Sequence, residues 1–221
     1  MIEKYFDLGI RFKWTKPADV NPAIKDGRIV DSTRQSNLMI YDGLDTIVSP
    51  RLRMMNVSAL GLTMRMPIQH AWLDYAHGQT ARIAQGPYDV LTGLMSGCII
   101  TRWQDRGVTY VGHVGTITGD LTVNRQVKRT FAFAMNKTTT GFNPAGAFSD
   151  GELFDLSRIY KPVRMVVILA IVTTKGEFFA VAMLPTNSSV QPHLNTEWCA
   201  AGVKRVPPIG HDALKMQLLR D

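Results

Sequence analysis

The chain has 221 residues, of which 45% are hydrophobic and 19% are charged, with a formal net charge of +7 and a pI near 9.6. This length and usage are typical of one globular domain with its own core, and they exclude an intrinsically disordered chain. Neither Cys98 nor Cys199 has metal-ligand spacing, which argues against a disulfide scaffold and a zinc site. The longest apolar run, residues 163–172, is about half as long as a membrane-spanning helix.

The N-terminal half is predicted to contain short elements separated by turns. Turn signals such as Lys16-Pro17 divide the first sixty residues into strands and loops at one edge of the fold. Residues 68–76 fit a helix or a strand, and their aromatic content does not decide between the two. Asp89 is placed to cap a short helical turn that includes Val90, Leu91 and Leu94.

Strands dominate the second half of the prediction. Two β-rich runs on either side of the Gln104-Asp105-Arg106-Gly107 turn predict a hairpin over residues 98–115. Further strands are predicted at residues 131–135, 163–173 and 178–184, and the last two are joined by a tight turn and buried on both faces. Near the end, Asp212 caps a short helix in which Leu214 and Leu218 share one face.

The hairpin brings a thiol towards an imidazole. A loop centred between Asp105 and Arg106 places Cys98 directly opposite His113, with Cβ atoms about 4.5–5.5 Å apart. At this distance the pair suits a nucleophile and its base, and an imidazolium lowers the thiol pKa from about 8.5 toward 6. A three-residue loop with Gly107 in the left-handed conformation turns the two side chains to opposite faces. Since a lone buried cysteine is more often an inert core residue, geometry alone leaves both interpretations open.

Small residues precede the cysteine. Ser96 and Gly97 stand where the chain enters the first strand of the hairpin, so a substrate carbonyl can approach the backbone closely there. Their N–H groups are therefore candidate donors of an oxyanion hole.

Two short motifs resemble a known catalytic signature. The run Leu-Met-Ser-Gly-Cys at residues 94–98, followed by Val-Gly-His-Val-Gly-Thr at residues 111–116, resembles the cytotoxic necrotizing factor deamidases and the Burkholderia lethal factor. The interval of 15 residues (113 − 98) between Cys98 and His113 fits the necrotizing-factor type. Thr92, six residues before the cysteine, is similar to the third catalytic position of the lethal factor and of chemotaxis-receptor deamidases. Met95 has no counterpart in the lethal factor's shorter Leu-Ser-Gly-Cys run.

This resemblance implies a fold and a reaction. The implied fold is a single catalytic domain over residues 1–221, of class α+β, with a β-sandwich of mixed sheets flanked by helices and loops. In the implied reaction, which needs no cofactor and no metal, Cys98 attacks the carboxamide of one glutamine in a host protein. His113 is its base and Thr92 orients the imidazole.

The resemblance also implies a setting. The expected substrate is a host translation-initiation RNA helicase, and the alternative is a Rho-family GTPase. We expect a monomeric bacterial toxin that enters the host cytoplasm, because the chain begins with Met and shows no signal peptide, delivery region or receptor-binding region. No membrane insertion is expected.

Two other classes of function remain open. The basic run at residues 125–129, with Phe131 and Phe133 beyond it and Arg51-Leu52-Arg53 as an extension, suits an RNA-binding module, but it matches no RNA-binding motif, so a solvated charged edge is the favoured interpretation and no nucleic-acid partner is expected. A papain-like protease or peptidoglycan amidase shares the order of cysteine before histidine.

The remaining reactive and aromatic side chains carry no distinct signal. The other histidines and the second cysteine lack ligand spacing and are interpreted as structural or surface residues: His70, His77, His193, His211 and Cys199. Three aromatic residues suit either the mouth of a substrate cleft or the core: Trp72, Tyr75 and Trp103.

Overall fold

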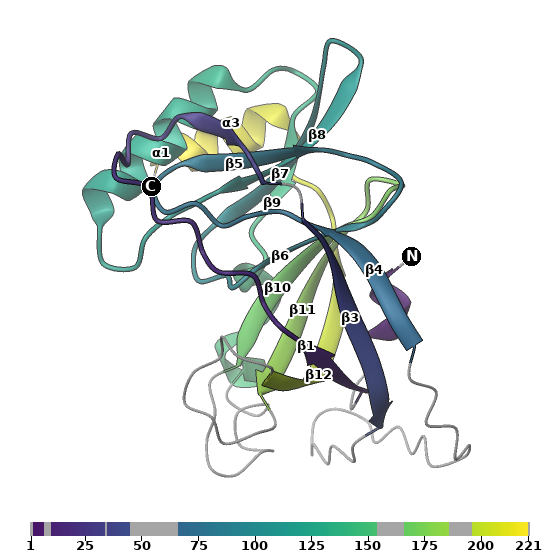
Figure 1. Cartoon of the computed structure of the whole chain (residues 1–221). Coiled ribbons are helices and arrows are strands. Elements are labelled where there is room, and N and C mark those ends of the chain that lie inside the picture. Colours follow the sequence, from purple (N-terminus) through teal and green to yellow (C-terminus); the bar gives the residue numbers. More distant parts are fainter. Residues whose placement is uncertain are drawn as a thin grey trace.

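The computed structural model of the chain describes residues 2–6, 10–33, 35–44, 66–153, 166–185 and 196–220. In Figure 1 these residues form three layers, with a helical layer at the top, a five-stranded sheet beneath it and a larger sheet at the bottom. His193 and the segment Arg51-Leu52-Arg53 lie outside the described residues. No helix within the described ranges has the length and apolarity to cross a membrane.

The larger sheet closes into a barrel in the order β1-β12-β11-β10-β6-β4-β3, with β3 paired to β1. Adjacent strands of the barrel are antiparallel except β4 and β6, which run parallel to each other. The strands of the barrel are β1 (Ile10–Trp14), β3 (Gln35–Leu44), β4 (Met66–Trp72), β6 (Val90–Gly93), β10 (Val167–Val172), β11 (Phe178–Pro185) and β12 (Thr196–Val206).

The five-stranded sheet has the order β2-β5-β8-β7-β9, and only β2 and β5 are parallel within it. Its strands are β2 (Ile29–Asp31), β5 (Thr80–Ala84), β7 (Ile99–Asp105), β8 (Val108–Val114) and β9 (Thr140–Phe142). The named helices are η1 (Ile2–Tyr5), α1 (Leu121–Ala134), η2 (Ala145–Ala147) and α3 (His211–Arg220). The predicted α+β class with mixed sheets flanked by helices is confirmed, and the larger sheet in addition closes on itself.

Three apolar clusters fill the spaces in and between the layers. One fills the barrel around Trp72 and Trp198, a second lies between the barrel and the five-stranded sheet, and a third lies beneath α1 and α3. Strand β10 contributes to two of them, because Leu169 points into the barrel while Ala170 faces the five-stranded sheet. The predicted burial of this strand on both faces is therefore confirmed.

Two local predictions are wrong because tertiary contacts decide the structure there. Residues 131–135 lie in or directly after α1, not in a strand: Asp120 caps this helix by accepting the Val123 N–H at 3.0 Å, and Phe131 packs beneath it. Asp89 caps no helix, because its carboxylate accepts backbone N–H groups from Ile2 at 2.6 Å and Thr174 at 2.7 Å. The residues after it form β6, which is buried along its whole length.

Other predictions are corrected in part. The open segment at residues 68–76 contains most of β4. Strands β1 and β3 lie within the closed barrel rather than at an edge. The C-terminal helix with buried Leu214 and Leu218 is confirmed, although it begins at His211 and so places Asp212 within its first turn.

The predicted hairpin is present as β7 and β8, but its register differs from the predicted one. Arg106 and Gly107 form the two-residue connection with φ values of 48° and 79°, and Ile100 stands opposite His113. Positive φ at both positions is the pattern of a type I′ turn, whose twist suits a hairpin. Because the shift is by two residues and side chains alternate with period two, it leaves the predicted face of each side chain unchanged.

Gly115, directly after β8, allows a close backbone approach. A Cβ there would lie 2.0 Å from the carbonyl oxygen of Ala76 and 2.8 Å from that of Gln79. We expect Gly115→Ala to lower the free energy of unfolding by about 1–3 kcal/mol, measured by urea denaturation. Gly86→Ala is the matched control, since a Cβ at Gly86 meets nothing within 4 Å. Equal stability of the two variants would contradict the close approach.

Candidate functional site

His113 faces the barrel from the middle of the five-stranded sheet. It stands opposite Ile100 of β7 and Ala81 of β5, and both of these residues belong to the core between the two sheets. Its Nδ1 lies 2.8 Å from Thr92 Oγ1, which belongs to β6 of the barrel. The structure thus brings together His113 and Thr92, and both are fully buried.

The other ring nitrogen of His113 is available for chemistry. Nε2 is buried and has no hydrogen-bond partner among the residues that the structure describes. A buried imidazole nitrogen without a partner forgoes about 1–3 kcal/mol of favourable interaction. Since Thr92 holds Nδ1, the orientation of the ring is set while Nε2 is left to exchange a proton with another group.

Cys98 lies on the same face but is not hydrogen-bonded to His113. It immediately precedes β7 and shares a core cluster with Ile100, two residues further along. This makes it a diagonal neighbour of His113, at about 7–8 Å in a regular sheet, and not the directly opposed partner that was predicted. Its Sγ lies 3.4 Å from Thr116 Oγ1 and 3.9 Å from Thr116 O.

Tyr75 completes the group and was assigned only to a cleft mouth or the core. Its ring stacks on the His113 imidazole with centroids 5.1 Å apart and an interplanar angle of 21°. Its hydroxyl donates to the carbonyl oxygen of Thr116. Tyr75 therefore contacts the base and also the residue that holds the nucleophile. No spacing signal connects Tyr75 with Thr116, since they are 41 residues apart.

The resting state of the pair is uncharged. Burial raises the pKa of the Cys98 thiol, and hydrogen bonding from Thr116 and Gly97 opposes this only in part. Burial lowers the pKa of His113 to about 3, and the positive charge of Lys16 adds to the effect. The expected low thiol pKa is therefore wrong for this state, because no imidazolium stands beside the sulfur. At neutral pH the site holds a thiol and a neutral imidazole.

Lys16 is a buried cation near this group that was identified only as part of a turn. Its Nζ donates to the Pro17 carbonyl at 3.0 Å and forms an ion pair with Asp19. Burial raises the pKa of Tyr75, and the negative charge of Asp19, together with that of Cys98 once its thiol is ionised, adds to that effect. The segment that carries Lys16 and Asp19 therefore lies close to the site.

Ser96 and Gly97 occupy the exposed side of the site. Ser96 is exposed and Gly97 half-buried, whereas Cys98 retains 1% of its accessible surface. Among the described residues, no backbone–backbone hydrogen bond uses the N–H of Ser96 or Gly97. The Ser96 N–H thus remains available to a substrate oxygen, as the predicted oxyanion role requires, whereas the Gly97 backbone already hydrogen-bonds to the Cys98 sulfur.

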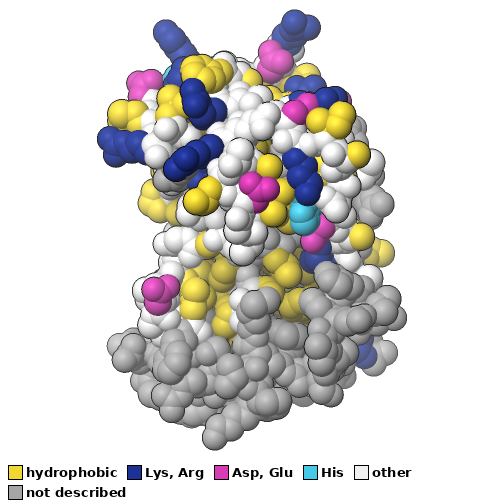
Figure 2. Space-filling model, turned by 90° about the vertical axis from the view of Figure 1, so that its left-hand side faces the viewer, with side chains coloured by type: hydrophobic (Ala, Val, Ile, Leu, Met, Phe, Trp, Pro, Cys, Tyr) yellow, Lys and Arg dark blue, Asp and Glu magenta, His cyan; other side chains and the backbone are white. Residues whose placement is uncertain are grey.

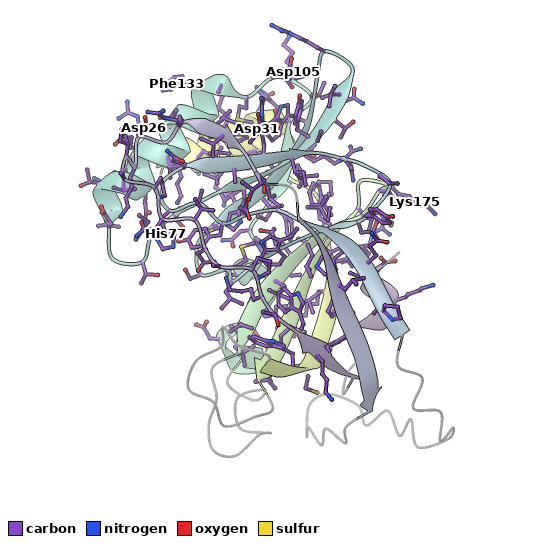
Figure 3. All side chains as sticks on the ribbon, in the orientation of Figure 1. Asp26, Asp31, His77, Asp105, Phe133 and Lys175 are labelled. Carbon is purple, nitrogen blue, oxygen red and sulfur yellow. The ribbon has the colours of Figure 1, made fainter. Side chains whose placement is uncertain are left out.

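The other candidate residues lie elsewhere. Trp72 and His70 are buried in or against the barrel interior, Trp103 packs on Phe131 under α1, and Cys199 is buried. His77 is the exception, because its ring lies against that of Tyr75 with centroids 4.5 Å apart. In Figure 3, Asp105 lies at the tip of the hairpin. Among the described residues, no group of three or more His, Cys, Asp or Glu side chains could hold a metal ion.

The basic run at residues 125–129 lies on α1 rather than on a strand edge. In Figure 2, Lys and Arg side chains gather over the upper part of the face shown. Arg125, Arg129 and the 69% exposed Phe133 line an open hollow of about 480 Å³. Neither arginine has an ion-pair partner among the described residues.

The raised thiol pKa predicts slow alkylation. We expect iodoacetamide to label Cys98 slowly at neutral pH, with a rate that keeps rising well into the alkaline range, because only the thiolate reacts. Peptide mapping by mass spectrometry measures the rate, and Cys98→Ser supplies the background from Cys199. A rate that levels off near neutral pH would show a preformed thiolate and contradict this arrangement.

The buried imidazoles predict a loss of stability in acid. The folded-state pKa is about 3 for His113 and about 4 for His70, whereas an unfolded histidine titrates near about 6.5. Below this pH the unfolded chain binds protons that the folded chain does not. The contribution is therefore complete above about pH 6.5 and is lost as the pH falls towards 4, by about 1.4 kcal/mol per pH unit for each histidine.

Urea unfolding at a series of pH values measures this loss. His70→Leu removes one of the two groups and should reduce the slope by about one proton per molecule. An unchanged slope would mean that His70 is not buried in its neutral form.

Comparison with protein-family models, curated proteins and solved structures finds no match to this chain. What the chain does is therefore inferred from the geometry around Cys98 and His113 and from the two short motifs that contain them.

Proposed function

We propose that this chain is a cysteine-dependent protein-glutamine deamidase. The observation that carries the proposal is the orientation of His113: Thr92 holds Nδ1 at 2.8 Å, while Nε2 is buried, on the face that also carries Cys98, without a partner in the described parts of the chain. A nucleophile, a base and a group that orients the base are the parts that covalent acyl transfer requires.

The first half of the reaction forms a thioester. The Cys98 sulfur attacks the carboxamide carbon of glutamine while its proton passes to His113 Nε2, and the carbonyl oxygen becomes an oxyanion near the N–H groups of Ser96 and Gly97. The imidazolium then protonates the amide nitrogen, the carbon–nitrogen bond breaks and ammonia leaves. Because the imidazolium and the oxyanion form together, each compensates for burial of the other.

The second half regenerates the enzyme. His113, again neutral, accepts a proton from water, and the hydroxide attacks the thioester carbonyl carbon. The carbon–sulfur bond breaks and the imidazolium returns a proton to the Cys98 sulfur, which leaves glutamate on the substrate. A depressed imidazole pKa suits this cycle, since His113 begins each half as a base.

Two substrates in the host cell follow from the resemblance of the motifs. A translation-initiation RNA helicase is the first, and a Rho-family GTPase is the alternative that the interval of 15 residues between Cys98 and His113 favours. The positive net charge of +7 would speed encounter with an acidic substrate surface. Delivery into the host cytoplasm forms part of the same proposal.

Incubating the chain with each purified target tests the proposal. We expect a gain of about one dalton at one glutamine of one target, which tandem mass spectrometry locates. Cys98→Ser should abolish the gain and His113→Ala should slow it by at least about 100-fold. Thr92→Val keeps the shape of the side chain but removes the hydrogen bond to His113 Nδ1. We expect it to lower kcat by about 100-fold at a similar KM.

The products separate the competing reactions. Cleaved peptide bonds would identify a protease and count against the deamidase. Deamidation at the same rate by Cys98→Ser would also contradict the proposal, since the chemistry would then not need the thiol.

A further inference from the structure

The two strands of the hairpin part directly beside Cys98. The β7–β8 ladder ends at the pair Ile99 and Val114. Before this point Met95 N–H donates to Ile168 O of the barrel, and beyond it Gly115 bonds with residues 78 and 79. No backbone hydrogen bond of the described residues joins residues 95–98 to residues 115–118. The hairpin therefore ends in a fork whose two branches are held by different neighbours.

The hydrogen bonds that cross this fork all involve a side chain of residues 95–98. Ser96 Oγ lies 3.5 Å from Thr118 Oγ1, and the Cys98 sulfur lies 3.4 Å from Thr116 Oγ1. The second branch is firmly placed, because the Asn124 side chain accepts the Ile117 N–H at 2.6 Å and donates to the Ile117 carbonyl at 2.8 Å. A substrate side chain that reaches the buried sulfur therefore has the fork as the least restrained route.

Thr116 has two oxygens close to the position of a substrate group that the Cys98 sulfur attacks. In the resting structure the carbonyl oxygen accepts the Tyr75 hydroxyl and lies 3.9 Å from the sulfur, and Oγ1 lies 3.4 Å from it. The nitrogen of a carboxamide under attack is within about 3 Å of the sulfur, so it falls within hydrogen-bond reach of these oxygens. A primary carboxamide has two N–H groups to donate.

We propose that Thr116 recognises the NH₂ group of the substrate carboxamide, with the oxygens that contact the Cys98 thiol and the Tyr75 hydroxyl in the resting structure. This inference rests on the proposed function and adds the residue that selects a primary carboxamide. An ester has no N–H to donate, and the product carboxylate would set negative oxygen against the Thr116 oxygens. Buried acceptors left unpaired in this way penalise the wrong ligand.

Tyr75 is the positioning residue of this arrangement. Its ring stays on the His113 imidazole at 5.1 Å while its hydroxyl holds the Thr116 carbonyl. The incoming NH₂ competes with this hydroxyl for the carbonyl oxygen. Tyr75→Phe keeps the ring and removes the competitor.

The test uses two alkylating reagents that differ in the substituents of the amide nitrogen. Iodoacetamide is a primary carboxamide, and N,N-dimethyl-2-iodoacetamide carries two methyl groups in place of the two N–H hydrogens, so that the isosteric variant Thr116→Val is needed to separate the hydrogen bond from the added bulk. The rate ratio of the two reagents is measured at Cys98 by peptide mapping, with glutathione as the unstructured reference thiol. We expect the ratio at Cys98 to exceed that of glutathione by about tenfold, the factor that one hydrogen bond contributes.

The matched variants are Thr116→Val and Thr116→Ser. Valine keeps the branched shape without the hydroxyl and should bring the ratio down towards that of glutathione, whereas serine should keep it. Tyr75→Phe should raise the ratio and serves if Thr116→Val does not fold. A wild-type ratio equal to that of glutathione would overturn the proposal. Labelling of Cys98 only after denaturation would overturn it too, because the reagent is itself a small primary carboxamide.

His113→Ala separates this proposal from the proposed function. In one outcome, the ratio of the two alkylation rates stays high, deamidation is absent, and His113→Ala is alkylated at the same rate as the wild type. Thr116 then recognises carboxamides, but the proposed reaction is wrong. If deamidation occurs and needs His113 while the ratio matches glutathione, the reaction stands and Thr116 does not select the substrate.

Discussion

The hydrogen bond between Thr92 and His113 links the barrel to the five-stranded sheet, and the arrangement of the site depends on it. It spans 2.8 Å between fully buried side chains, in an interface that is otherwise mostly apolar. Apolar contacts are not directional and set only the separation of the two sheets. A hydrogen bond with one acceptable geometry also fixes how the sheets lie along each other, and it fixes the plane of the imidazole.

Burial of that interface explains the charge state of the site. A neutral thiol and a neutral imidazole are cheaper to bury than an ion pair without further hydrogen bonds. The Lys16 charge reinforces the neutral form of His113. Reactivity therefore depends on the arrival of a group that can carry the developing negative charge. Such a site reacts slowly with small electrophiles while it is empty, and this slows oxidation of the thiol.

Much of the site could be predicted from local sequence, and the rest could not. The β-rich runs around Cys98 and His113 identify the hairpin, and alternation places both side chains on one face. The exact register was missed because Arg106 adopts a positive φ of 48°, where asparagine or aspartate is the usual residue. The hydrogen bond from the Tyr75 hydroxyl to the Thr116 carbonyl could not be predicted from the sequence, because it joins segments that are 41 residues apart.

Closure of the barrel has a consequence for how the chain acquires its structure. β1, near the N-terminus, pairs with β12, and the Trp198 indole donates to the Trp14 carbonyl across 184 residues of sequence. Strands β1 and β11 present open edges until β12 lies between them. The ring therefore cannot close until the last strand has been synthesised, and a chain still on the ribosome exposes two unpaired β-edges to its neighbours.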